Sequence, residues 1–391
     1  MILIATIWSL FSTFGMAQSD YKTIHQQSLV VDTHADVLLQ VLRGADISKK
    51  LESGHVDLIR LKEGGVDVQV FAVWPNPESE YEKSMYKQSV HLIDLFDTLM
   101  QNNPDKIVHT RSPEEIMKAQ KENIIAACLG LEGGTAIEND LDKLQYFYDR
   151  GVRYMSLTWN DSPEWASSAH DEISAEFAGN RGLSEFGKEV IRKMNEMGMI
   201  VDVSHSGEKT FWDVIATSTK PIIASHSCVY SICPHYRNLK DDQIKALADN
   251  DGVLFINFYP GYLKKGFDRQ YQSVRNSTKA YLDSVRQSYG DDILGYRKYR
   301  STFLAEQTKT FRPTVDIIVD HMDYIINLVG DDHVGLGSDF DGISITPAGI
   351  DDVSEMPEIT KVMIERGYSQ ERVQKILGGN FMRVFREVSK N

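Results

Sequence analysis

The sequence has few cysteines and no excess of positive charge. Its three cysteines, Cys128, Cys228 and Cys233, are too few and too odd in number for a disulfide framework in a chain of 391 residues. We expect Cys128 to pack in the core, whereas Cys228 and Cys233 could pair across a short loop. Acidic residues exceed basic ones, which leaves a formal net charge of −14. We therefore expect no nucleic-acid partner, because neutralising phosphates requires a basic surface.

Long apolar runs are also lacking, and the one at the N-terminus is short. Residues 1–17 carry no charged side chain, and their apolar run, 2–14, is too short for a membrane span. Small residues at Gly15 and Ala17 predict a signal peptide cleaved before Gln18, although its start lacks Lys and Arg. The alternative is a retained membrane anchor. Because no cysteine lies near the cleavage point and the C-terminus has no apolar tail, we expect no stable membrane anchor and a secreted or periplasmic protein.

What the sequence does contain is a series of short apolar runs rich in Val and Ile, with helical stretches between them. This alternation is typical of βα units around a parallel sheet, and the continuous hydrophobicity of the runs fits strands covered on both faces. Eight runs predict an α/β protein with a (β/α)8 TIM barrel, at 29–33, 66–73, 124–131, 152–158, 199–204, 221–225, 253–258 and 333–337.

No repeat, low-complexity tract or linker divides the chain, so we expect residues 18–391 to form a single barrel domain. Helical periodicity in 141–150 and 183–197 is followed by Gly151 and Gly198, as is common just past a helix end. Residues 261–312, after the seventh run, are charged, Tyr-rich and partly helical in pattern. We expect this insertion to lie near the barrel mouth and shape access to it. The alternative is a solvated decoration or an oligomer contact.

Carboxylate and imidazole side chains recur where the predicted strands end. A lone His-x-Asp, or a lone Glu after a strand, carries little information by itself. The catalytic residues of β/α barrels, however, gather at the C-terminal strand ends, so recurrence there predicts a metal site. Five predicted strands end in such residues: His34 with Asp36, Glu132, His205, His226, and Asp339 with Asp341.

The ligand types indicate the metal. Imidazole and carboxylate without thiolate fit Zn²⁺, with manganese or cobalt as alternatives. Five candidate ligands favour two metal ions bridged by one carboxylate over one crowded ion.

Seven short stretches follow one another in a specific order: VDTHAD (31–36), LEGG (131–134), DVSH (202–205), ASHS (224–227), RN (237–238), GSDFDG (337–342) and GGN (378–380). Together they resemble the membrane dipeptidase (renal dipeptidase) family, within the amidohydrolase-like metal-dependent barrel enzymes. The resemblance covers nearly all of the mature chain. It implies an amidohydrolase-like fold, two Zn²⁺ per chain, dipeptide substrates and a homodimer.

The resemblance also implies a role for each metal ligand. His34 and Asp36 would bind one zinc ion, and His205 and His226 would bind the other. Glu132 would bridge both ions. This division agrees with the spacing of the residues along the chain.

The resemblance implies two further roles, and the chain departs from the family pattern at one position. Asp339 would take a proton from the attacking water and deliver it to the leaving amine, and Arg237 would bind the terminal carboxylate of the substrate. For Arg237 the alternative is an ordinary surface ion pair. Vertebrate members place a substrate-contacting histidine after the fourth strand, where this chain has Trp159 and Asn160. Asn160 or His170 could replace it as a polar donor.

The sequence therefore predicts a zinc-dependent dipeptidase that also accepts some dipeptides with a C-terminal D-residue. One alternative is another metal-dependent amide or ester hydrolase on the same scaffold. Many of those use a carbamylated lysine as the bridge, and no Lys ends a predicted strand here. The other alternative is a secreted barrel that binds peptide or metal without turnover.

Overall fold

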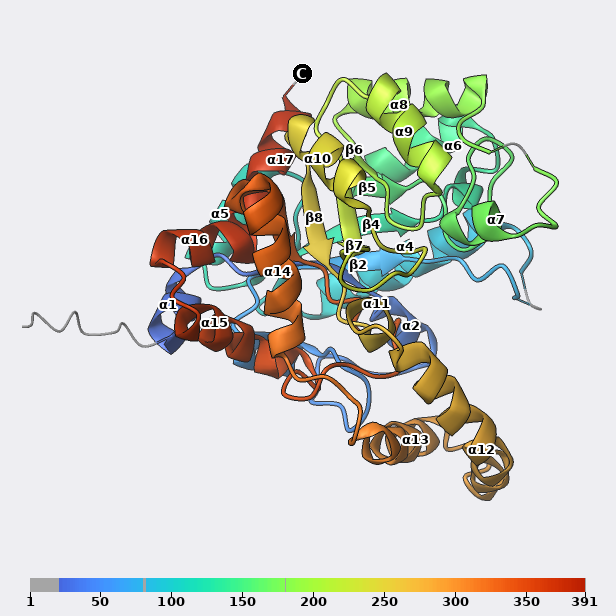
Figure 1. Ribbon diagram of the computed structural model, residues 1–391, viewed down its shortest axis with the longest axis vertical. Helices are drawn as coiled ribbons and strands as arrows, with labels where there is room; N and C mark the ends of the chain where they lie inside the picture. The colour runs from blue at the N-terminus through green and yellow to red at the C-terminus, as the bar shows by residue number, and fades with distance from the viewer. Residues whose placement is uncertain (1–20, 80–81, 180, 391) are drawn as a thin grey trace, which may run out of the picture.

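The described part of the chain, residues 21–79, 82–179 and 181–390, is built around one parallel sheet in the computed structural model (Figure 1). Eight strands follow one another, and each pairs with the next in parallel. They are β1 (Val31–Ala35), β2 (Val68–Val73), β4 (Ile125–Glu132), β5 (Val152–Ser156), β6 (Ile200–Asp202), β7 (Ile223–Ser227), β8 (Val253–Ile256) and β9 (Val334–Leu336).

The first and last of these strands are joined at their ends, which nearly closes the sheet. A parallel bridge links Ala35 to Phe340. The buried carboxylate of Asp32 accepts hydrogen bonds from the backbone N–H and the hydroxyl of Ser338, at 2.8 and 2.6 Å. The predicted (β/α)8 barrel is thereby confirmed.

One strand was not predicted. β3 (Ile107–His109) pairs with the first half of β4, on the edge where β5 pairs further along. Three residues with two apolar side chains are too short to stand out as a run. The bounds of predicted strands also shift: β1 begins at Val31 rather than at 29 and includes His34.

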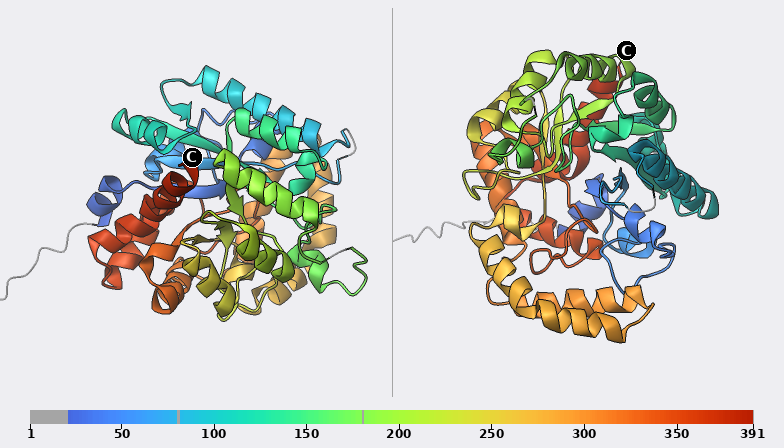
Figure 2. Two further views of the ribbon diagram at one scale, coloured as in Figure 1. Left: turned by 90° about the horizontal axis from the view of Figure 1, so that it is seen from above. Right: turned by 90° about the vertical axis from the view of Figure 1, so that its right-hand side faces the viewer.

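Helices connect the strands and surround the barrel (Figures 1 and 2). The hydroxyl of Ser184 caps α8 by accepting a hydrogen bond from the N–H of Gly187, and Gly198 ends this helix with a left-handed φ of 79°, as predicted. The helices outside the insertion are α1 (Tyr21–Gln27), α2 (Leu38–Leu42), α3 (Leu58–Glu63), α4 (Met85–Asn102), α5 (Pro113–Lys121), α6 (Leu141–Asp149), α7 (Ala169–Ile173), α8 (Glu185–Met197), α9 (Glu208–Thr217), α10 (Asp241–Asp249), α14 (Asp316–Val329), α15 (Met356–Glu365), α16 (Gln370–Gln374) and α17 (Asn380–Ser389).

The insertion after β8 is more helical than the sequence indicated. It contains α11 (Pro260–Leu263), α12 (Phe267–Ser288) and α13 (Ile293–Thr308). In Figure 1 the arrow of β8 points toward α11, and α12 and α13 lie beyond it on the same side of the barrel. A small apolar cluster holds the two long helices to the loop after β9, through Phe267, Tyr271, Leu282, Leu304 and Ile345.

Two predictions concern the cysteines and the termini. Cys128, Cys228 and Cys233 are all buried and free, so the suggested pairing of Cys228 with Cys233 is not formed. The predicted signal peptide, residues 1–17, lies outside the described residues. Within those residues, we find no helix with both the length and the apolar character needed to cross a membrane.

The amino ends of the strands are covered by α17. Phe381 and Phe385 of this helix belong to one buried cluster with Val31, Val68 and Val253, which are the first residues of their strands. We expect Phe385→Ala to lower the free energy of unfolding by about 3–5 kcal/mol, because it leaves a cavity in this cluster. Chemical denaturation would measure the change.

The matched control is Ile173→Ala, because this side chain is 64% exposed at the end of α7. It should change the free energy of unfolding by about 0.5 kcal/mol at most. Equal effects of the two substitutions would show that α17 does not pack as described.

Candidate metal centre

The predicted metal ligands converge at the carboxyl ends of the barrel strands. His34 lies in β1, Glu132 ends β4 and His226 lies in β7, whereas Asp36 and His205 lie just beyond β1 and β6. All five side chains are buried. Because parallel strands bring their carboxyl ends to one face, residues separated by almost 200 positions share a single site.

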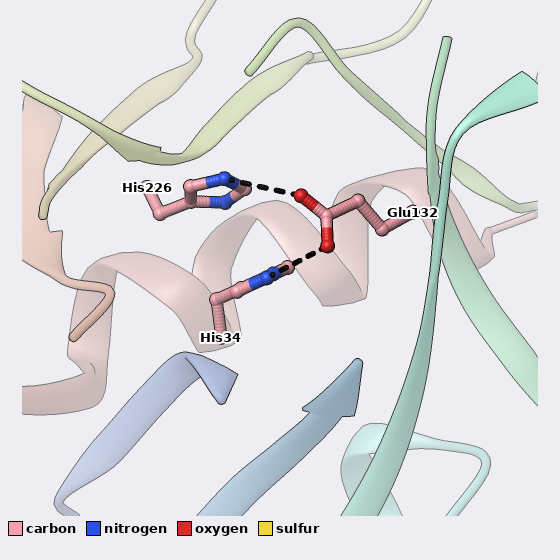
Figure 3. A group of neighbouring side chains, drawn as sticks. All are labelled: His34, Glu132 and His226. Atoms are coloured by element: carbon pink, nitrogen blue, oxygen red, sulfur yellow. Dashed lines mark ion pairs between the residues drawn. The ribbon is translucent and has the colours of Figure 1, made fainter. Parts of the chain in front are cut away.

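Glu132 lies between two groups of these residues. Its Oε2 is 3.4 Å from His34 Nε2, and its Oε1 is 3.1 Å from His205 Nε2 and 3.6 Å from His226 Nε2. Asp36 Oδ2 lies 3.7 Å from His34 Nε2. Figure 3 shows His34 and His226 facing different oxygens of the Glu132 carboxylate. One oxygen therefore faces His34 and the other faces the pair of histidines from the opposite side of the barrel.

Tyr154 determines which nitrogen of His34 is free. Its hydroxyl donates to the carbonyl of Thr33 at 2.9 Å, so it accepts the hydrogen bond from His34 Nδ1 at 2.8 Å. The proton of the neutral ring is then on Nδ1, and the lone pair of Nε2 points toward Glu132. This nitrogen is buried and has no hydrogen-bond partner among the described residues.

The other two histidines are held in the same way. The Ser225 hydroxyl donates to Asp202 at 2.6 Å and accepts from His226 Nδ1 at 2.8 Å. The side-chain oxygen of Asn160 accepts from His205 Nδ1 at 3.2 Å. The two Nε2 atoms therefore present lone pairs to each other at 3.0 Å. Facing lone pairs are unfavourable without a cation nearby, so this arrangement fits a metal ion better than a hydrogen bond.

The charges around His34 indicate the same conclusion. Burial disfavours a charged ring, but Tyr154 and the Glu132 carboxylate outweigh it and raise the pKa of His34 well above its ordinary value. Burial also raises the pKa of Asp36, and the nearby Glu132 adds to that effect. The raised pKa of His34 reports a negative potential at this ring that a divalent cation would neutralise.

His205 has the opposite character. Burial and the nearby charge of Arg237 lower the pKa of His205 to about 4. For Glu132, burial favours the neutral acid, but the charge of His34 and the close contacts with His205 and His34 outweigh it and hold the pKa of Glu132 below its ordinary value. Neutral imidazole and ionised carboxylate are the forms that bind metal, so His205 and Glu132 have the protonation states that a metal ligand requires.

Asp339 lies at the same centre, after β9. Its backbone N–H donates to the carbonyl of His34 at 3.0 Å, and its Oδ2 accepts a hydrogen bond from Asn257 at 2.8 Å. Burial and the charge of Asp36 raise the pKa of Asp339 well above its ordinary value. Ligand atoms of His34, Asp36 and Asp339 lie within 4.8 Å of one another, so the geometry allows Asp339 as a metal ligand as well as a proton carrier.

The loops that carry these side chains are tightly constrained. His205, Asp339 and Asp341 have φ values of 65°, 61° and 66°, which non-glycine residues adopt rarely and often at active sites. Gly342 leaves room for the carboxylates, because a Cβ there would collide with both Asp36 and Asp339. These unfavourable backbone conformations direct the side chains of His205, Asp339 and Asp341 toward the site.

A cavity of about 450 Å³ opens over the centre, and Asp36, Glu132, His205 and Asp339 line it. Its rim includes Tyr259 and four residues of the insertion, which therefore reaches the barrel mouth: Tyr262, Tyr271, Arg275 and Arg297. A larger cavity of about 900 Å³ adjoins it and shares Arg297 and Asp341, but none of the predicted metal ligands line that second space.

Trp159 and Asn160 both line the smaller cavity. The ring of Trp159 lies 5.0 Å from that of Trp74 and 6.3 Å from that of His205, measured between centroids. Asn160 contacts His205, so it orients a predicted ligand in addition to facing the cavity. His170 is exposed, interacts with Asp171, and does not line the cavity, which leaves Asn160 as the polar group in this position.

Arg237 is buried rather than on the surface, and it contacts Tyr262, which lines the cavity. It donates to the carbonyl of His226 at 3.2 Å, and its guanidinium lies over the ring of Tyr262 at 5.5 Å. Among the described residues no carboxylate lies within ion-pair distance of it, and its Nε is buried without a hydrogen-bond partner. The alternative of a surface ion pair is therefore wrong.

Several positioning residues were not recognised in the sequence. Tyr154, Asp202 and Ser225 act on the histidines, and Asn257 acts on Asp339. Asp202 carried a signal that could have been used, because a carboxylate within an apolar strand needs partners. Tyr154 looked like an ordinary aromatic strand residue, and only its contact with His34 distinguishes it.

With the geometry established, comparison with known proteins gives a consistent result. Residues 18–391 match the family model of the membrane dipeptidases, peptidase family M19. An uncharacterized dipeptidase of Schizosaccharomyces pombe is 32% identical over 95% of this chain and 83% of its own length. Dipeptidase tcpJ of Claviceps purpurea is 31% identical over 86% of this chain and 70% of its own length.

Solved structures confirm the fold. The probable dipeptidase PvdM of Pseudomonas aeruginosa superposes with a TM-score of 0.77 at 24% identity, covering 95% of this chain and 98% of that one. A metallopeptidase of Rhodobacter sphaeroides superposes with a TM-score of 0.73 at 24% identity, covering 92% and 99%. The chain therefore belongs to the membrane dipeptidase family, peptidase family M19, and is a metal-dependent hydrolase that acts on the peptide bond of dipeptides.

Proposed function

We propose that this dipeptidase uses two zinc ions and accepts dipeptides with a C-terminal D-residue as well as L-dipeptides. The observation that carries the two-ion proposal is the position of Glu132, whose two oxygens face different histidine groups. His34 and Asp36 would hold one ion, His205 and His226 the other, and Glu132 both. Imidazole and carboxylate donors without thiolate support zinc.

When bound, the two ions would make a water molecule nucleophilic near neutral pH and polarise the peptide carbonyl. The remaining chemistry belongs to the chain. Asp339 would accept the proton of the attacking water and pass it to the amine nitrogen as the peptide bond breaks. Asn257 holds one oxygen of Asp339, which leaves the other for this transfer.

The ends of the substrate would be recognised by other residues. Arg237 carries an unpaired Nε beside the cavity, and a carboxylate would supply the acceptor that it lacks. A cavity of about 450 Å³ under the insertion suits a dipeptide better than a long chain. The Rhodobacter sphaeroides metallopeptidase was solved with a phosphinate mimic of L-Ala-D-Ala, which supports including D-residues in the proposal.

The test is a panel of L-L and L-D dipeptides, with matched tripeptides, given to zinc-loaded protein. Hydrolysis of dipeptides, its loss with a chelator and its return with zinc are expected. Failure of every metal-loaded preparation on the whole panel would contradict the proposal and favour a binding protein. Cleavage of tripeptides as fast as dipeptides would contradict the role of the terminal carboxylate.

We also propose that residues 1–17 direct export and that two copies associate. Both ideas rest on the sequence and on the family. The mass of the intact protein from the culture medium would show cleavage before Gln18, and its native mass would show the number of copies. An uncleaved chain or a monomer would contradict the respective idea.

Tyr154→Phe should weaken metal binding by about 10–100-fold while leaving the fold intact, because His34 loses the acceptor that orients its ring. Titration with a chromogenic chelator would measure the affinity. Tyr281→Phe is the control, since this tyrosine is half-exposed on α12 and far along the chain from the ligands. Equal affinity in wild type and Tyr154→Phe would show that the hydrogen bond does not prepare His34.

A further inference from the structure

One wall of the smaller cavity is basic. Arg43, Arg275 and Arg297 all line it, and they come from three different segments: the end of α2, α12 and α13. In Figure 1 these three elements lie on the same side of the barrel, below the strand ends. Segments distant in the sequence thus bring three permanent positive charges to one space.

These arginines lack dedicated acidic partners. Among the described residues no carboxylate lies within 4.0 Å of Arg43, Arg275 or Arg297, whereas five other arginines have such a partner: Arg60, Arg150, Arg312, Arg366 and Arg372. Arg297 donates one hydrogen bond to the neutral side chain of Gln40, at 2.9 Å. Asp341 also lines the cavity and its charge acts on Arg43 and Arg297, but its carboxylate accepts hydrogen bonds from the N–H of His55 and from Gln40, at 2.7 and 3.2 Å.

Two of these arginines, Arg43 and Arg297, also repel each other. Burial, and then the charge of Arg43, lower the pKa of Arg297. Arg297 is half-buried, whereas Arg43 and Arg275 are exposed, and an anion placed between these like charges would relieve their repulsion. Trp74 and Trp159 also line the cavity, with their ring centroids 5.0 Å apart. Besides the arginines, the cavity therefore offers aromatic surface to an apolar group and holds carboxylates of the metal centre, Asp36, Glu132 and Asp339.

We propose that this basic wall selects dipeptides that carry a second carboxylate, on a side chain, in addition to the terminal one. The proposal rests on the proposed dipeptidase function and names its substrate class. Arg237 lies after β7, close to His226, and is separate from the wall formed by the insertion and α2. The terminal carboxylate and the second one would thus have different arginines.

The experiment compares pairs of substrates that differ only in charge. Glu-Ala against Gln-Ala, and Ala-Glu against Ala-Gln in both L and D forms at the C-terminal residue, report each position separately. In the wild type we expect kcat/KM to favour the acidic member of at least one pair by about tenfold or more, as for a partly desolvated charged hydrogen bond. The preference should shrink when salt is raised, because added ions screen the charges.

The variant Arg275→Gln/Arg297→Gln should bring that ratio close to one. Arg269→Gln is the matched control, because Arg269 lies on the same helix, is exposed, and does not line the cavity. It should keep both the ratio and the activity of the wild type. Melting temperatures of all variants would establish that they are folded.

The outcomes separate the two proposals. Dipeptide hydrolysis with equal rates for acidic and neutral members overturns the basic-wall inference alone. An acidic preference that survives in Arg275→Gln/Arg297→Gln, or that Arg269→Gln removes equally, also overturns it. Absence of hydrolysis of any dipeptide overturns the proposed function and this inference with it.

Discussion

Replacing Glu132 by Gln is expected to abolish dipeptide hydrolysis and to reduce the metal content of the purified protein. Both carboxylate oxygens face imidazole nitrogens, at 3.1 to 3.6 Å, and the amide nitrogen of Gln cannot bind a cation. Because loss of a group that merely orients a ligand costs about 10–100-fold, loss of the bridging ligand itself should cost more than about 100-fold in kcat/KM. Elemental analysis and dipeptide kinetics would measure the two effects.

The control for this substitution is Glu164→Gln. Glu164 is exposed and does not contact the metal centre. Among the described residues its side chain accepts a hydrogen bond only from Asn139. Metal content and kcat/KM should equal those of the wild type. If Glu132→Gln retained two metal ions per chain, the bridge would be assigned wrongly.

Asp339→Asn is expected to lower kcat by about 10²–10⁴-fold, the contribution typical of a positioned acid or base. Asn cannot take up the proton, yet it has nearly the same shape and still fits beside Gly342 and Asn257. Metal content should stay at the wild-type value. Two measurements are therefore needed: steady-state kinetics to test the proton transfer and elemental analysis to determine the metal content.

This pair distinguishes the two roles that the geometry allows for Asp339. A variant with normal metal content and a low kcat supports the proton carrier. A variant that loses metal would identify Asp339 as a ligand together with His34 and Asp36, whose ligand atoms lie within 4.8 Å of it. Asp268→Asn, on the insertion, is a suitable control because it is the same chemical change outside the group of metal residues.

Much of the barrel could be predicted because its strands are buried on both faces and appear as continuous apolar runs. The same reasoning failed for β3, since three residues beside the start of β4 bury too little to leave a pattern. It also placed His34 after a strand, whereas the residue lies within β1. Periodicity locates an element well and its ends poorly, because the ends depend on pairing with neighbouring strands.

The sequence by itself determined the barrel, the family and the set of candidate ligands, because each depends on local patterns repeated along the chain. Only the tertiary structure decided how those ligands are prepared. Tyr154 and Asn160 direct the lone pairs of His34 and His205 through contacts between strands that are distant in sequence. The basic wall also depends on the tertiary structure, because its arginines come together only where the insertion reaches the barrel mouth. Such contacts leave no local pattern, since each residue acquires its role from a partner that the fold supplies.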